Sequence, residues 1–133
     1  MKKILMTSLF ILLTTVIQAK DDGIECKEDG TQIELNRCAY DELQKADKEL
    51  NRVYRELRKA KKESRLFLAN LKKSQKAWLV FRDLELDAQF TCKSGNISEC
   101  FGSIYPLSFN SAKTELTNQR IKTLKRLLYD TTL

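Results

Sequence analysis

Residues 71–83 read Leu71-Lys72-Lys73-Ser74-Gln75-Lys76-Ala77-Trp78-Leu79-Val80-Phe81-Arg82-Asp83. Leu71, Gln75, Trp78 and Arg82 recur in this stretch at spacings of four, three and four residues. These spacings place the four side chains on one face of a helix. A face that mixes leucine and tryptophan with glutamine and arginine is costly to bury unless its polar groups find partners.

A second stretch, residues 46–54, has the same character. Its Asp47, Asn51 and Tyr54 lie beside Leu50 on one helix face. Each stretch carries polar groups that the other could satisfy, so we expect them to interlock as a helix pair.

Local signals place helices over most of the chain. Glycine and proline are absent from residues 31–94, and Thr31 with Glu34 forms the capping-box pattern that begins a helix. Apolar residues then recur every three or four positions as far as residue 60, which predicts a helix with one buried seam. The seam residues are Ala39, Leu43, Ala46, Leu50, Val53, Leu57 and Ala60.

The seam ends near residues 61–64, where we expect a turn, and a second helix is predicted over residues 64–91. The alternative of one uninterrupted helix is disfavoured, because it could bury its seam only against another chain. Residues 93–102 contain two glycines and predict a loop. Ser103 is expected to cap a third helix, with Pro106 in its first turn. The sequence therefore predicts an all-α fold: a three-helix up-down-up bundle, dominated by a long helical hairpin, with two disulfides.

The N-terminus predicts export. Lys2 and Lys3 precede an apolar run from Ile4 to Ile17, and Ala19 precedes a charged segment. This is the pattern of a signal peptide over residues 1–19, which leaves a domain over residues 20–133. The run is short for a membrane span. We therefore expect a periplasmic or secreted protein with no stable membrane insertion after cleavage.

Four cysteines in a short exported chain indicate two disulfides, and three pairings are open. We favour Cys26–Cys38 and Cys92–Cys100, because each bond closes a short loop. The chain has no histidine and no closely spaced cysteine pair, so we expect neither a metal site nor a cofactor.

An enzyme is disfavoured as well. With the cysteines oxidised, the chain offers no thiolate, no histidine base and no glycine-rich phosphate loop. The polar residues of the two stripes could form a ligand site, but buried charges in small domains are usually paired with one another. We interpret them, with Thr117 and Arg120 of the third helix, as a structural network. Its predicted members are Asp47, Asn51, Tyr54, Gln75, Trp78, Arg82, Thr117 and Arg120.

Charge is unevenly distributed along the chain, whose formal net charge is +6. In an up-down-up bundle, one end gathers the segments 20–43 and 83–99, in which acidic residues predominate. The other end gathers the segments 55–76 and 122–126, in which basic residues predominate. Export argues against nucleic acid as the partner of the basic end. An anionic membrane surface or cell-wall polymer stays open as an alternative.

The ordered set of motifs resembles the LprI-type lysozyme inhibitor family. The resemblance covers nearly all of the predicted mature chain. The matching residues are Cys26 and Cys38; Asp47, Leu50, Asn51 and Tyr54; Leu71, Gln75, Trp78, Arg82 and Asp83; Leu116, Thr117, Arg120 and Leu124. One departure concerns the second cysteine pair. The family usually has cysteines at the positions held here by Leu86 and Ala112, whereas this chain has Cys92 and Cys100.

The resemblance implies an exported helical protein that binds and inhibits lysozyme. We expect steric inhibition through the acidic end, with the loop between Ser94 and Ser103 as the contact. The alternative is an envelope-binding or immunity protein with another partner, such as a toxin, and the oligomeric state is open. The predicted partner-binding residues are Asp87, Ser94, Gly95, Asn96, Glu99 and Phe101.

Overall fold

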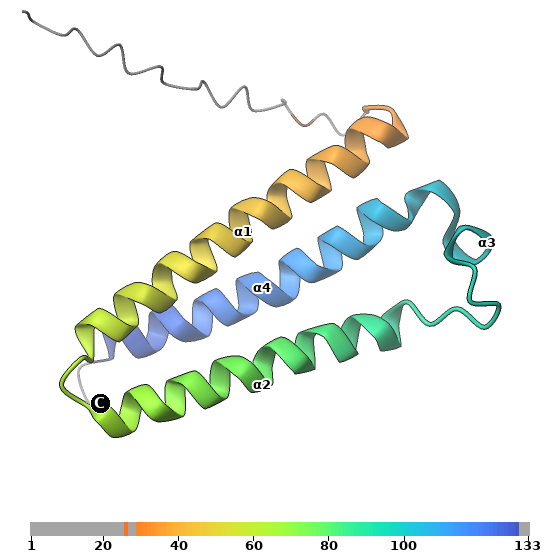
Figure 1. Ribbon diagram of the computed structural model, residues 1–133. Helices are drawn as coiled ribbons and strands as arrows, with labels where there is room; N and C mark the ends of the chain where they lie inside the picture. Colours follow the sequence, from red (N-terminus) through yellow and green to blue (C-terminus); the bar gives the residue numbers. More distant parts are fainter. Residues whose placement is uncertain (1–25, 27–28, 131–133) are drawn as a thin grey trace, which may run out of the picture.

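The computed structural model describes residue 26 and residues 29–130, and it confirms the all-α, up-down-up bundle. Its elements are α1 (Gln32–Ala60), α2 (Arg65–Gln89), the short α3 (Ile97–Phe101), the 3-10 turn η1 (Gly102–Ile104) and α4 (Tyr105–Tyr129). Helices α1 and α4 run in the same direction, and α2 runs antiparallel to both (Figure 1). The predicted signal peptide, residues 1–19, lies outside the described residues.

Helix α1 begins as its sequence predicts. The Thr31 hydroxyl accepts the N–H of Glu34, and the Glu34 carboxylate accepts the N–H of Thr31 at 2.7 Å. This capping box satisfies two backbone donors that the helix itself leaves unpaired. The predicted seam is buried except at Ala60, which is exposed beside the turn.

The core lies mainly between α1 and α4. Helix α1 packs far more extensively against α4 than against α2. The expectation that the first two helices interlock is therefore incomplete, because α2 lies along the paired α1 and α4. The central core cluster comprises Leu50, Val53, Leu57, Leu71, Ile121 and Leu124.

The turn between α1 and α2 falls at the predicted place. Helix α1 ends at Ala60, and the Ser64 hydroxyl caps α2 by accepting the N–H of Phe67. Helix α2 ends at Gln89, two residues before the predicted end.

The connection from α2 to α4 differs from the prediction in two respects. The predicted loop contains α3, and Gly102 ends this helix at a φ of +62°, which favours glycine. The prediction that Ser103 caps the third helix is wrong. Asn36 of α1 does so instead, because its Oδ1 accepts the Leu107 N–H at 3.2 Å while its Nδ2 donates to the Ser103 carbonyl at 3.1 Å.

Both favoured cysteine pairs form disulfides. Cys26 is bonded to Cys38 of α1, and Cys92 is bonded to Cys100 of α3. The second bond closes the segment between α2 and α3. The two positions where the family usually has cysteines are apolar here. Leu86 is 1% exposed, and Ala112 is half-buried.

Candidate functional site

Arg82 of α2 is the most deeply buried charged residue of the predicted network, with 9% of its surface exposed. Its Nη1 lies 3.7 Å from Oδ1 of Asp47 in α1, and its Nε donates to Oδ1 of Asp83 at 3.2 Å. The guanidinium also lies over the ring of Trp78, with 5.2 Å between Cζ and the ring centroid. A buried cation is tolerated when carboxylates and an aromatic face surround it in this way.

Arg120 brings α4 into the same network. Its Nε donates to Gln75 Oε1 at 3.0 Å, and its Nη2 donates to Ser74 Oγ at 2.9 Å. Its Cζ lies 5.9 Å from the centroid of Trp78, so two guanidinium groups contact one indole. Burial lowers the pKa of Arg120 from its ordinary value, because removal from water disfavours the charged form.

Thr117 is placed differently from the other network residues. It is completely buried, and its hydroxyl donates to the Lys113 carbonyl of its own helix at 2.8 Å. The structure therefore brings Asp47, Arg82 and Trp78 together with Gln75 and Arg120, while Thr117 bonds within α4. Ser74 also belongs to the network through its hydrogen bond with Arg120, and the sequence motif did not indicate this residue.

A groove of about 420 Å³ lies between α1 and α2, and part of this network lines it. Its lining contains amide, hydroxyl, carboxylate and cationic groups but no thiol or imidazole. Among the described residues, no cluster of histidine, cysteine, aspartate or glutamate is arranged to hold a metal ion. The groove is lined by Asp47, Leu50, Asn51, Tyr54, Lys72, Gln75, Lys76, Leu79 and Arg82.

The second candidate site is the end of the bundle that carries α3, which we call the α3 end and define as residues 29–42 and 83–105. Ser94, Gly95, Asn96 and Glu99 are all exposed there. Asn96 caps α3 by accepting the Ser98 N–H at 3.1 Å, and its amide donates to the Glu99 carboxylate at 2.8 Å. Gly95 has a φ of +71°, a conformation that favours glycine. The predicted loop residues are thus exposed and ordered by local bonds.

Phe101 is half-buried within a cluster of four aromatic rings. Its ring centroid lies 5.6 Å from that of Phe90 and 5.7 Å from that of Tyr105, and Phe109 completes the group. Phe90, Tyr105 and Phe109 were not predicted as site residues, although aromatic residues on both sides of a short loop signal such a cluster. Asp87, in contrast, is exposed on the last turns of α2.

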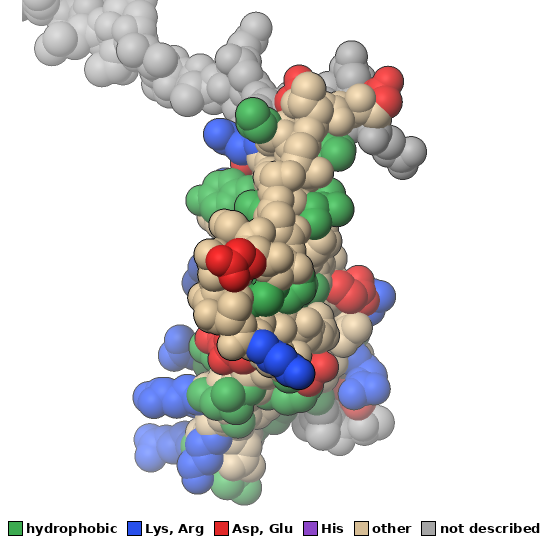
Figure 2. All heavy atoms as spheres, turned by 90° about the vertical axis from the view of Figure 1, so that its right-hand side faces the viewer, with side chains coloured by type: hydrophobic (Ala, Val, Ile, Leu, Met, Phe, Trp, Pro, Cys, Tyr) green, Lys and Arg blue, Asp and Glu red, His purple; other side chains and the backbone are tan. Residues whose placement is uncertain are grey.

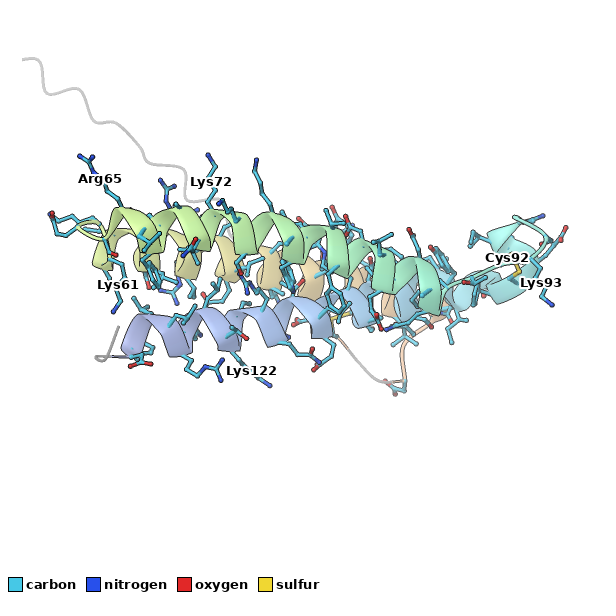
Figure 3. All side chains as sticks on the ribbon, turned by 90° about the horizontal axis from the view of Figure 1, so that it is seen from below. Lys61, Arg65, Lys72, Cys92, Lys93 and Lys122 are labelled. Atoms are coloured by element: carbon cyan, nitrogen blue, oxygen red, sulfur yellow. A yellow bond between two sulfur atoms is a disulfide. The ribbon has the colours of Figure 1, made fainter. Side chains whose placement is uncertain are left out.

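The described part of the chain has opposite charge at its two ends. Acidic side chains are spread over the α3 end, with hydrophobic side chains between them (Figure 2). Lys61, Arg65, Lys72 and Lys122 lie in the half of the bundle away from Cys92 (Figure 3). The acidic residues of the α3 end are Asp29, Glu34, Asp41, Glu42, Asp83, Glu85, Asp87 and Glu99, and its basic residues are Arg37 and Lys93.

The described chain is a disulfide-stabilised helical bundle. The family model described as "Lysozyme inhibitor LprI" matches residues 25–124, and the chain belongs to this family. It is a family of inhibitors rather than of enzymes.

The chain is also 29% identical over 132 residues to the uncharacterized protein R02472 of Rhizobium meliloti (strain 1021), with 91% of each chain covered. No solved structure matches the chain. Within the residues that the structure describes, no helix is both long enough and apolar enough to cross a membrane.

Proposed function

We propose that this protein is an exported lysozyme inhibitor that contacts the enzyme with its α3 end and blocks access to the substrate cleft. The observation that carries the proposal is the excess of acidic over basic side chains at the α3 end, where the Cys92–Cys100 disulfide closes the exposed segment that carries Glu99. Membership in the lysozyme inhibitor family supports the class of partner.

Rigidity of the α3 end favours binding. The disulfide, the Asn96 cap and the aromatic cluster around Phe90 each restrict this segment before it meets a partner. A segment that is already ordered loses less conformational entropy on binding than a flexible loop does. Insertion of the α3 end into a concave enzyme cleft therefore costs less conformational entropy than insertion of a flexible loop would.

The net positive charge of the protein does not prevent it from binding a lysozyme that is also basic. Association depends on the patches that meet and not on the net charges of the two proteins. Glu99 and the acidic residues at the start of α1 would face the enzyme, while the basic half of the bundle would point away. Inhibition of this kind needs no bond to be made or broken.

The experiment measures cell-wall lysis by several lysozymes with the protein, its Glu99→Lys variant and its Lys122→Glu variant. Glu99→Lys reverses a charge at the α3 end, and Lys122→Glu reverses an exposed charge on α4 far from it. We expect Glu99→Lys to weaken inhibition about tenfold, as one unfavourable charge contact does. Lys122→Glu should leave it within about twofold. Absence of inhibition and of complex formation at micromolar protein would refute the proposal.

The basic half of the bundle supports a second candidate, binding to an anionic envelope component. Arg58 and Lys62 are exposed near the α1–α2 turn, and Arg65 and Lys72 project away from α4 (Figure 3). Sedimentation with anionic vesicles or cell walls tests this candidate. Reversing Arg58 and Lys62 would abolish such binding, whereas lysozyme inhibition through the α3 end would persist.

A further inference from the structure

Helix α2 carries an apolar face that the bundle does not cover. Val80 is 60% exposed, Leu84 is 61% exposed and Phe81 is 53% exposed. Ala77, Val80 and Leu84 are separated by three and four residues, so they share one side of the helix. That side is opposite the buried Leu71, Arg82 and Leu86. Contiguous exposed apolar side chains of this size mark an interaction surface.

Charged residues flank this face in a symmetric arrangement. Lys73 lies seven residues before Val80, and Asp87 lies seven residues after it. Both therefore lie on the same side of the helix as the apolar residues, at its two ends. On one flank, Lys76 precedes Val80 by four residues and Asp83 follows it by three. All four charged side chains are exposed.

We propose that a second copy of this chain packs on this face, with the two α2 helices antiparallel about a two-fold axis at Val80. In this arrangement Lys73 of each copy faces Asp87 of the other. Lys76 likewise faces Asp83. Ala77 of each copy faces Leu84 of the other, so that a small side chain meets a large one as in packed helix pairs.

The pattern of charges selects this occupant and this direction. A parallel pair would place Lys73 against Lys73 and Asp87 against Asp87, and both contacts are repulsive. Only the antiparallel pair converts every flanking contact into an attraction. Asp83 already accepts a hydrogen bond from Arg82, yet its side chain is 61% exposed and can also meet a lysine.

The expected dimer is reversible. Val80 and Leu84 are 60% and 61% exposed, so within the described residues no other helix covers this side and a second helix can approach it. One helix pair buries an area at or below the low end of stable interfaces, on the order of 1,200 Å². Dimerisation should therefore depend on protein concentration and should weaken as salt screens the flanking charges.

Analytical ultracentrifugation of the purified protein across the micromolar range at low salt tests the proposal. The unmodified protein should change from monomer to dimer, and Leu84→Glu should stay monomeric. Lys73→Glu should weaken dimerisation at least about tenfold, and combining it with Asp87→Lys should restore it, because the exchanged charges again face each other. Lys122→Glu, the same charge change away from this face, serves as the control.

Several results would overturn the proposal. One is a protein that is monomeric at every concentration, and another is a Leu84→Glu variant that dimerises as strongly as the parent. Failure of the double exchange to restore the dimer would reject the antiparallel arrangement. Loss of lysozyme inhibition in a monomeric Leu84→Glu variant whose circular dichroism is unchanged would assign the face to the enzyme instead.

Discussion

Asn36 in α1 caps the beginning of α4 through a hydrogen bond from the Leu107 N–H to its Oδ1, at an N–O distance of 3.2 Å. The Asn36 amide also donates to the Ser103 carbonyl, and Gln32 donates to the same Asn36 oxygen at 2.8 Å. Asn36 therefore joins two helices through a bond to a residue 71 positions away in the sequence. It also fixes the start of α4 beside the α3 end.

Replacing Asn36 with alanine should lower the free energy of unfolding by about 1 kcal/mol, the usual effect of losing a helix cap. Urea unfolding followed by circular dichroism measures the change. Asn70→Ala is the matched control, because Asn70 is exposed near the start of α2 and tests helix propensity alone. Equal effects of the two substitutions would show that the cap contributes nothing.

Acid should weaken the contact between α1 and α4 at Glu49. Hydrogen bonds from Arg52 and then from Lys125 lower the pKa of Glu49 from 4.5 to about 2. Because the folded pKa is lowered, the stabilisation is complete above the unfolded pKa and is lost as the pH falls toward about 2. We therefore expect Glu49→Gln to lose less stability than the parent protein between pH 4.5 and about 2.

Unfolding midpoints in urea at several pH values test this expectation. The control is Glu63→Gln, because the Glu63 side chain is 92% exposed beside the α1–α2 turn. This variant should follow the acid dependence of the parent. Parallel loss of stability in Glu49→Gln and the parent would contradict a lowered pKa of Glu49 in the folded protein.

The two disulfides should contribute differently to function. Replacing both Cys92 and Cys100 with serine should lower stability by about 2–3 kcal/mol, as expected for a short closed loop. It should also weaken lysozyme binding, because the α3 end loses its covalent restraint. Replacing Cys26 and Cys38 should give a similar loss of stability with a smaller loss of affinity. Calorimetric melting and titration with lysozyme separate the two effects, and the reverse order of affinities would count against the proposed surface.

The sequence predicted those features of the fold that depend on interactions between residues close together in the chain. The Thr31 capping box, the α1 seam and the turn before Ser64 each depend on residues close together in the chain. The cap from Asn36 to Leu107 escaped prediction because it joins distant segments, and no spacing rule encodes such a contact.

The helix within residues 93–102 escaped prediction for another reason. Asn96 caps a segment of only five residues, which no periodic pattern can reveal. Residues of both polar stripes lie around Trp78, although the stripes suggested too exclusive a pairing of α1 with α2. Arg120 was among the predicted members of the network, whereas its hydrogen bond to Ser74 became clear only in the folded chain.

Arg82 should matter for stability. Replacing it with methionine removes the contacts of the guanidinium with Asp47, Asp83 and the Trp78 ring. We expect a loss of about 1–3 kcal/mol, because Arg82 is buried while its acidic partners are partly exposed. Urea unfolding measures it, with the exposed Arg65→Met of the same helix as control. Equal midpoints for the two variants would contradict a stabilising role for Arg82.

We propose that the structural network holds the bundle together while the α3 end binds lysozyme. The most direct measurement is the dissociation constant of the lysozyme complex for Arg82→Met and Glu99→Lys, at a temperature where both variants are folded. We expect Arg82→Met to keep the affinity of the parent and Glu99→Lys to bind lysozyme about tenfold more weakly. Lost affinity in Arg82→Met together with unchanged affinity in Glu99→Lys would contradict it and would assign binding to the groove between α1 and α2.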